Sequence, residues 1–174
     1  MKKVLLPLVL ITFGFFSCLE DGLSVTFKLS GLTANYTLKA QDVVVGTFNI
    51  TSDNISTDAP EFAQYNTSLD KISAAKLKSL KITINNPATE DWSFANSASL
   101  YLKGNGLDEV KIASKMSIDQ SSNIIECDVE DVEVVEHIKS GGFTLRTEFE
   151  IDEQLVSDVD VQVDMTYEVT ATAL

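Results

Sequence analysis

The sequence predicts an all-β protein, an antiparallel β-sandwich with one or two short helices in its connections. Two observations support this prediction. Apolar and polar residues alternate with a period of two over most of residues 23–174, and most segments between the alternating runs are short. A parallel βαβ arrangement would need long helical crossovers, which these connections do not supply. About eight strands, each with one apolar and one polar face, favour two packed sheets of the immunoglobulin-like kind.

Four strands are expected in the first half of the chain. The third is β-branched and apolar enough to be a central strand, and Gly46 within it indicates a bulge or a close backbone approach. The polar stretch 51–67 has no sustained period and is predicted to form a long loop. Ser68 is expected to begin a short helix that leads into the fourth strand. The four strands are expected at residues 23–29, 36–40, 43–50 and 80–84.

The second half contains the clearest turn signal, Gly104-Asn105-Gly106, because Asn-Gly tolerates the positive φ angles of a type I′ hairpin. It is expected to join a strand at 99–103 to a returning strand at 110–112. Residues 130–140 change to a helical spacing, so a short helix is one interpretation of that stretch. The two longest alternations, 143–151 and 158–169, are predicted to be antiparallel neighbours in one sheet.

The N-terminal residues predict export. Lys2 and Lys3 precede the apolar run 4–16, which is followed by Ser17 and Cys18. A basic start, an apolar middle and a small residue at the cleavage site are the parts of a secretory signal. The apolar run is too short for a hydrocarbon core of about 30 Å, which needs about 20 residues. One interpretation of this segment is an ordinary signal peptide that is cut at a position unrelated to Cys18.

The residues around Cys18 also resemble a bacterial lipoprotein signal, in which the cysteine is lipidated and becomes the first mature residue. Phe15 and Phe16 stand where the usual signal has leucine and a small residue, and this ending is similar to that of Bacteroidetes lipoproteins. Glu20 and Asp21 resemble the acidic patch that directs lipoproteins of that phylum to the outer face of the outer membrane.

This resemblance implies three parts: a signal peptide at 1–17, a lipidated N-terminus with a short tether at 18–22, and a β-sandwich domain at 23–174. The mature part is loosely similar to small immunoglobulin-like lipoproteins of Bacteroidetes, most of which have no assigned function. The implied location is the bacterial outer membrane, with the domain facing the cell exterior. One expected partner is therefore the membrane itself, reached through the N-terminal lipid.

Charge and composition exclude several classes of protein. The formal charge is −13, and removal of Lys2 and Lys3 with the signal leaves −15. Such a domain is repelled by nucleic acid, so no nucleic-acid partner is expected. If Cys18 carries lipid, Cys127 has no intrachain partner, which excludes a disulfide framework. The single histidine, His137, cannot form a standard zinc site, and neither a metal nor another cofactor is expected.

Acidic residues are concentrated on one side of the last expected strand. If that strand pairs with its predecessor, the acids of the two strands face the same way, and Ca²⁺ is a conceivable ligand. The EF-hand spacing is absent, however, and a solvated face is the simpler interpretation. The residues concerned are Asp158, Asp160, Asp164, Glu168, Glu148 and Glu150.

The sequence contains no HExxH, GxSxG or Walker pattern, so the chain is predicted to be non-enzymatic. The expected role is that of a membrane-tethered binding or accessory subunit for a protein or glycan partner. Trp92, Phe94 and Tyr65 are the ligand-binding candidates, because sandwiches usually bind through loops. The competing interpretation of Trp92 and Phe94 is that both rings belong to the core.

Two other functions stay open at this stage. One is a carbohydrate-active enzyme with paired carboxylates, for which Glu90 and Asp91 beside Trp92, or Glu61 beside Phe62, are the candidates. The other is a fimbria-like structural subunit, which would need an unpaired sheet edge or a strand that can be donated.

Overall fold

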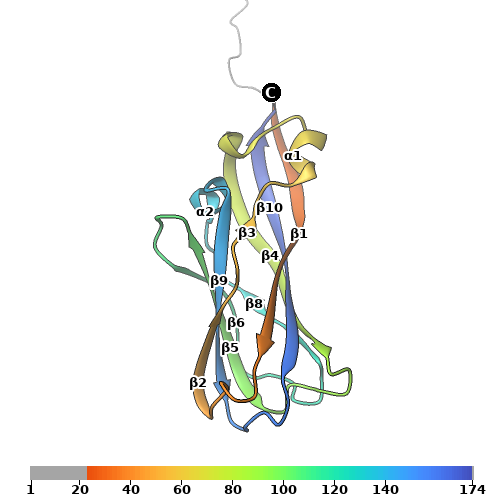
Figure 1. Ribbon diagram of the computed structural model, residues 1–174. Helices are drawn as coiled ribbons and strands as arrows, with labels where there is room; N and C mark the ends of the chain where they lie inside the picture. The colour runs from red at the N-terminus through yellow and green to blue at the C-terminus, as the bar shows by residue number, and fades with distance from the viewer. Residues whose placement is uncertain (1–22, 174) are drawn as a thin grey trace, which may run out of the picture.

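The computed structural model describes residues 23–173, and most of these residues lie in ten strands (Figure 1). The strands are β1 (Ser24–Leu38), β2 (Gly46–Thr51), β3 (Ile55–Ser56), β4 (Ile72–Asn86), β5 (Ala95–Gly104), β6 (Val110–Lys115), β7 (Ile124–Glu126), β8 (Asp128–Val129), β9 (Gly142–Ile151) and β10 (Val159–Thr172). The short helices are α1 (Pro60–Gln64), the 3₁₀ helix η1 (Leu69–Lys71) and α2 (Val135–Lys139).

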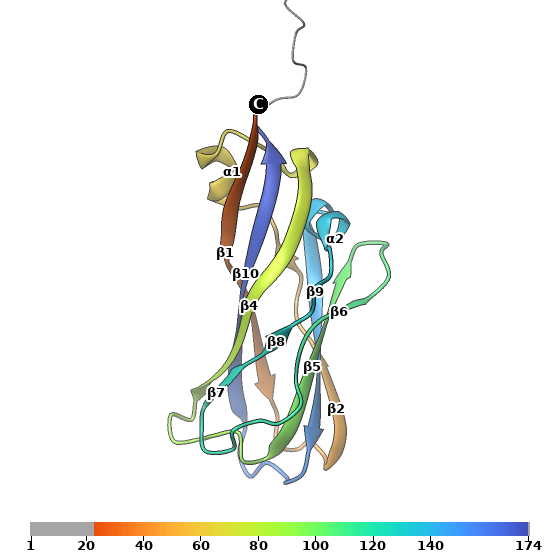
Figure 2. The ribbon, with the colours of Figure 1, turned by 180° about the vertical axis from the view of Figure 1, so that it is seen from behind.

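The strands form two antiparallel sheets that pack face to face, as the two views in Figures 1 and 2 show. The first sheet has the order β1-β10-β4-β7, and the second has the order β2-β9-β5-β6-β8, with β3 also paired to β9. The predicted all-β antiparallel sandwich with short helices in its connections is therefore confirmed.

The strand order is that of a jelly roll. The first strand pairs with the last, β10, and β2 pairs with β9, so the chain folds back on itself in two Greek keys. In an immunoglobulin domain the first strand instead lies beside the second, in the order A-B-E-D. The immunoglobulin-like description thus holds for the layered architecture and not for the connectivity. Alternation and turn residues are the same in both folds, which is why the sequence does not separate them.

A bulge explains the gap between the first two predicted strands, which are in fact one strand, β1. Gly31, with φ of 78°, lies at a register shift between Leu29 and Leu32. Before this shift Phe27 and Leu29 are buried, and after it the buried positions have even numbers, beginning with Leu32. Because one extra residue reverses which side chains face inward, the bulge keeps the apolar side of β1 on the core throughout.

The predicted central strand at 43–50 is wrong in both position and extent. Only β2 (Gly46–Thr51) is formed there, and it lies at the edge of the second sheet. Val43 is buried, whereas Val44 and Val45 are exposed in the connection that precedes β2. Three valines in a row look like a buried strand in the sequence, although only the first of them enters the core.

The predicted long loop at 51–67 contains regular structure that the sequence pattern did not reveal. Ser52 links β2 to β3 along the edge of β9: its N–H donates to the Leu145 carbonyl at 2.9 Å, and its hydroxyl accepts from the Leu145 N–H at 3.0 Å. The Ser52 hydroxyl thus takes the place of the backbone carbonyl that would accept from the Leu145 N–H in a regular sheet. Residues 60–64 of the stretch form helix α1, in which Phe62 is buried.

The helix predicted at Ser68 is only the three-residue η1, and β4 begins at Ile72 instead of near residue 80. β4 has three register shifts against β10, and the two that lie between Ile72 and Ser79 explain the difference. These irregularities space the buried residues Ile72, Ala75 and Leu77 unevenly, so that their pattern imitates a helix.

Two predictions for the second half are confirmed and two are wrong. β5 and β6 form the predicted antiparallel hairpin, and the helix within 130–140 is α2. The turn is not of type I′, because residues 105–109 separate the two strands and φ is positive at Gly106, at 71°, but not at Asn105. However, β9 and β10 are not neighbours, because β9 pairs with β2 and β5 while β10 pairs with β1 and β4. The connection 152–158 crosses from one sheet to the other.

The apolar side chains between the sheets form one core that extends from Phe27 to Ala171. Tyr36 crosses this core: its hydroxyl lies 3.2 Å from the Leu145 carbonyl and 3.1 Å from the Thr147 hydroxyl of the opposite sheet. Residues 23–173 therefore contain a complete sandwich. None of the helices in this range is long and apolar enough to cross a membrane.

The sandwich has two distinct ends (Figure 1). At the terminal end, the Ala173 N–H donates to the Leu23 carbonyl at 2.8 Å, and α1 lies close by. At the opposite end, which we call the distal end, the strands are joined by four connections. These connections are residues 39–45, 87–94, 116–123 and 152–158.

Candidate functional site

Trp92 and Phe94 are buried in the core near the distal end, with exposed fractions of 0% and 3%. The Trp92 ring stacks on Phe149, with centroids 5.3 Å apart, and it also contacts the Phe94 ring at 5.3 Å. The prediction that these two rings contact a ligand therefore does not hold in this structure. Glu90 and Asp91 accompany an inward-facing tryptophan, so no aromatic platform for a sugar lies between them.

Tyr65, the third candidate, lies at the terminal end and remains 38% exposed. One face of its ring stacks on Phe27, with centroids 4.7 Å apart. Phe62 of α1 contacts the same Phe27 edge-on at 5.6 Å. Tyr65 therefore closes this end of the core with one face and leaves the other side partly open to solvent.

A groove of about 800 Å³ lies between α1, η1 and the end of α2. We call it the terminal groove. This volume is within the range of sites for small molecules, about 300–1,000 Å³. One wall comes from the predicted loop and the opposite wall from Lys139 of α2. Its lining residues are Asp58, Ala59, Phe62, Ala63, Thr67, Ser68, Leu69, Asp70 and Lys139.

The walls of the terminal groove are fixed by hydrogen bonds. The Thr67 hydroxyl donates to the Thr172 carbonyl at 2.6 Å, which attaches this segment to the end of β10. The Ser68 hydroxyl donates to the Asp70 carboxylate at 2.5 Å, and this bond holds the pKa of Asp70 below its usual value. The groove thus combines an apolar floor with an ionised carboxylate on its rim. The sequence located one wall of the groove but contained no local signal for Lys139.

A smaller polar hollow of about 460 Å³ lies beside the β5–β6 hairpin. A Cβ atom at Gly142 would lie 2.6 Å from the Asn54 amide nitrogen, so a larger residue there would have to displace the Asn54 side chain. Lys103 is the charged residue of its lining, which otherwise consists of backbone and of uncharged side chains. The hollow shows no arrangement of groups that indicates a reaction.

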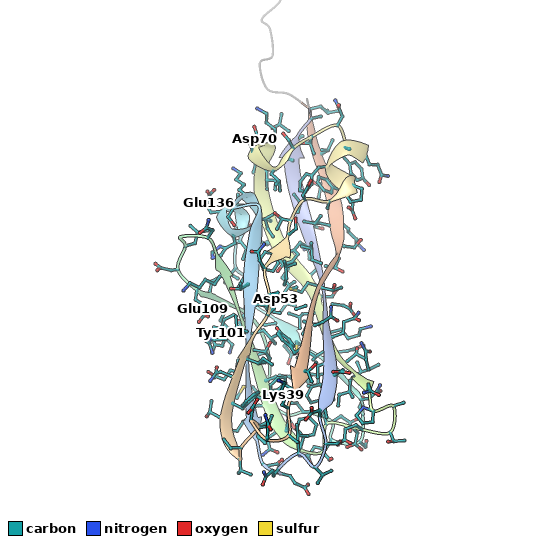
Figure 3. All side chains as sticks on the ribbon, viewed as in Figure 1. Lys39, Asp53, Asp70, Tyr101, Glu109 and Glu136 are labelled. Carbon is teal, nitrogen blue, oxygen red and sulfur yellow. The ribbon has the colours of Figure 1, made fainter. Side chains whose placement is uncertain are left out.

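The only arginine of the chain, Arg146, forms a clamp on the outer face of the second sheet with Glu109 and Tyr101, both of which are labelled in Figure 3. Its guanidinium donates to both oxygens of Glu109, at 2.9 and 2.8 Å, and lies 4.0 Å from the Tyr101 ring centroid. It also donates to Asn49 at 2.6 Å and to Glu148 at 3.1 Å. The hydrogen bond from Arg146 lowers the pKa of Glu109. A carboxyl group with a lowered pKa does not hold the proton that a general acid must donate, so Glu109 is unsuited to that role.

Replacement of Arg146 by alanine is expected to lower the free energy of unfolding by about 1–2 kcal/mol, because the bidentate pair joins the hairpin loop to β9. Partial solvent exposure keeps the effect below that of a buried pair. Urea unfolding would measure it, with Lys111→Ala as a control whose ion pair to Glu130 is loose, at 3.7 Å. Equal effects of the two substitutions would contradict the clamp.

Two acids of the stripe on β10 pair with lysines of β4. Glu168 lies 2.9 Å from Lys78, and Asp164 lies 3.5 Å from Lys81. Glu148 and Glu150 are on β9, in the other sheet, so they do not extend the stripe. Within residues 23–173, no group of three or more His, Cys, Asp or Glu side chains could hold a metal ion.

Comparison with known proteins gives no family and no curated relative, since neither search finds a match. Three viral structures show some similarity. Desmodium yellow mottle tymovirus is 16% identical over 99% of this chain and 97% of that chain, with a TM-score of 0.30. Cocksfoot mottle virus is 8% identical over 100% and 95%, with a TM-score of 0.26. The VP2 subviral particle of infectious bursal disease virus is 11% identical over 88% and 33%, with a TM-score of 0.28. At these scores the similarities carry no argument about function.

Proposed function

We propose that this chain is a lipid-anchored, non-enzymatic binding or accessory subunit at the outer face of a bacterial outer membrane. The observation that carries the proposal is the lipoprotein-like sequence that ends in Ser17-Cys18, followed by a tether of only a few residues before β1. Cys18 itself lies outside the described residues. An extended chain spans at most about 3.3–3.6 Å per residue, so this tether keeps the sandwich close to its lipid.

The geometry of the sandwich agrees with such an anchor. Both ends of the described chain lie at the terminal end, and the four distal connections lie at the opposite end (Figure 1). A lipid on Cys18 would hold the terminal end near the membrane and direct the distal connections away from it. Several acyl chains on one cysteine give a firm anchor, whereas one chain alone binds only marginally.

The fimbria-like alternative has less support from the sheet edges. The long edge strand β1 is bulged at Gly31, and its residue Ser30 is within hydrogen-bond distance of Glu61 in α1, at 3.3 Å. The edge strands β7 and β8 contain three and two residues, and β2, the other edge of the second sheet, contains six. Bulges, coverage and short strands are the devices that discourage strand addition.

Replacement of Cys18 by alanine is expected to abolish incorporation of radiolabelled fatty acid and to release the protein from membrane fractions. Cys127→Ala is the matched control, because it removes the other cysteine and should leave both properties unchanged. Fatty acid that remains on the Cys18→Ala protein would overturn the anchor. Protease treatment of whole cells then tests the orientation: cleavage is expected for a domain that faces the exterior.

A further inference from the structure

Three exposed valines lie at the distal end, on two neighbouring connections. Val44 is 58%, Val45 62% and Val156 93% exposed. The first two belong to connection 39–45 and the third to connection 152–158. Because β1 pairs with β10 and β2 pairs with β9, these connections cross between the sheets side by side. We call Val44, Val45 and Val156 the distal valines.

The backbone beneath the distal valines is well fixed. The Ala40 N–H donates to the Asp158 carboxylate at 2.9 Å, which joins one connection to the other. Each connection also inserts an apolar side chain into the core next to the exposed valines, namely Val43 at 0% and Leu155 at 6% exposure. Valine side chains are stiff at χ1, so they lose little freedom when a partner covers them. An apolar surface on a fixed backbone is a suitable docking site.

Acidic side chains are exposed on the same connections as the distal valines. Asp42, Asp152, Glu153 and Asp158 are exposed on the same two connections, against one exposed lysine, Lys39, which Figure 3 labels. The other two distal connections add further acids and neither lysine nor arginine. These further acids are Glu90, Asp91 and Asp119.

We propose that the distal end binds a protein whose contact surface has an apolar centre and a rim of lysine and arginine. Charge selects this occupant, because a second copy of the chain would place acids against acids and an anionic lipid surface would be repelled. The inference rests on the proposed function in one respect only: the lipid anchor is what would direct the distal end away from the membrane. The interaction itself needs no lipid and can be tested without it.

The test uses residues 18–174 with Cys18→Ser and a short amphipathic peptide of leucine and lysine as the probe. Nuclear magnetic resonance titration is expected to shift the backbone amide signals of the distal valines. Replacing all three valines by serine leaves the charge unchanged and is expected to weaken binding at least about tenfold, since each buried valine contributes more than 1 kcal/mol. Leu23→Ser, which removes an equally exposed side chain (77%) at the terminal end, should not weaken it.

Several outcomes would overturn the proposal. If the serine variant binds the peptide as tightly as the parent does, the binding is an attraction between opposite charges and does not involve the valines. Equal binding of a leucine–glutamate peptide, or self-association in sedimentation experiments, would reject the basic partner. Attachment to phosphatidylglycerol vesicles through the valines would identify a membrane instead. Loss of lipid in the Cys18 experiment has no effect on these results, so the two proposals can fail separately.

Discussion

Replacing Trp92 with alanine is expected to lower the free energy of unfolding by about 3–5 kcal/mol, a large share of the stability of a domain of this size. The ring is fully buried and stacks on Phe149 of β9. Alanine would leave a cavity at the distal end that the two sheets cannot close. Urea unfolding followed by circular dichroism would measure the change, because the variant has no other tryptophan to report fluorescence.

Trp92→Phe is the control that separates ring packing from the indole N–H. Phenylalanine keeps an aromatic ring against Phe149 and removes a nitrogen that is buried without a hydrogen-bond partner among the described residues. Leaving such a group unsatisfied costs about 1–3 kcal/mol, so its removal offsets part of the lost contact area. We therefore expect a much smaller effect than with alanine. A Trp92→Ala protein of unchanged stability would show that the ring lies at the surface, as a ligand platform would require.

The alternating pattern predicted the layers of this protein because side-chain burial has a period of two in any strand. It did not predict which strands pair. The alternations of β9 and β10 are the clearest in the sequence, yet they belong to different sheets. Pairing is decided by the packing of the whole core, and no local residue type records it. Bulges cause the errors in β1 and β4, since the shift at Gly31 and those in β4 interrupt the period within single strands.

The candidate site was harder to predict than the fold. Trp92 lies beside two acids in the sequence, which suggests exposure, but the turn of the chain directs its ring into the core. Conversely, Val44 and Val45 look like core residues and are exposed, because connection 39–45 crosses between the sheets and inserts only Val43. In both cases the direction of the backbone at the end of a strand decides exposure. The hydropathy of the residues alone does not predict the direction of the backbone there.

Alkaline pH is expected to destabilise the sandwich by several kcal/mol, because three buried or largely buried groups resist ionisation in the folded state. Burial raises the pKa of Tyr36 from its ordinary 10.0 to about 12, and that of Cys127 from 9.0 to about 12. Burial also raises the pKa of Tyr167. The unfolded chain therefore loses these protons at lower pH than the folded protein does, and stability falls as pH rises.

The pH window is set by these pKa values. The full contribution is present below about pH 9 and is lost between about pH 9 and 12, with a slope of up to about 1.4 kcal/mol per pH unit for each group. Tyr36→Phe should make the decline above about pH 10 shallower by one such slope. At neutral pH it should cost about 1 kcal/mol, because the Leu145 carbonyl loses the hydroxyl donor. Urea unfolding at a series of pH values would measure both effects. A Tyr36→Phe protein with the same alkaline slope as the parent would mean that this hydroxyl ionises as readily in the folded chain as in the unfolded one.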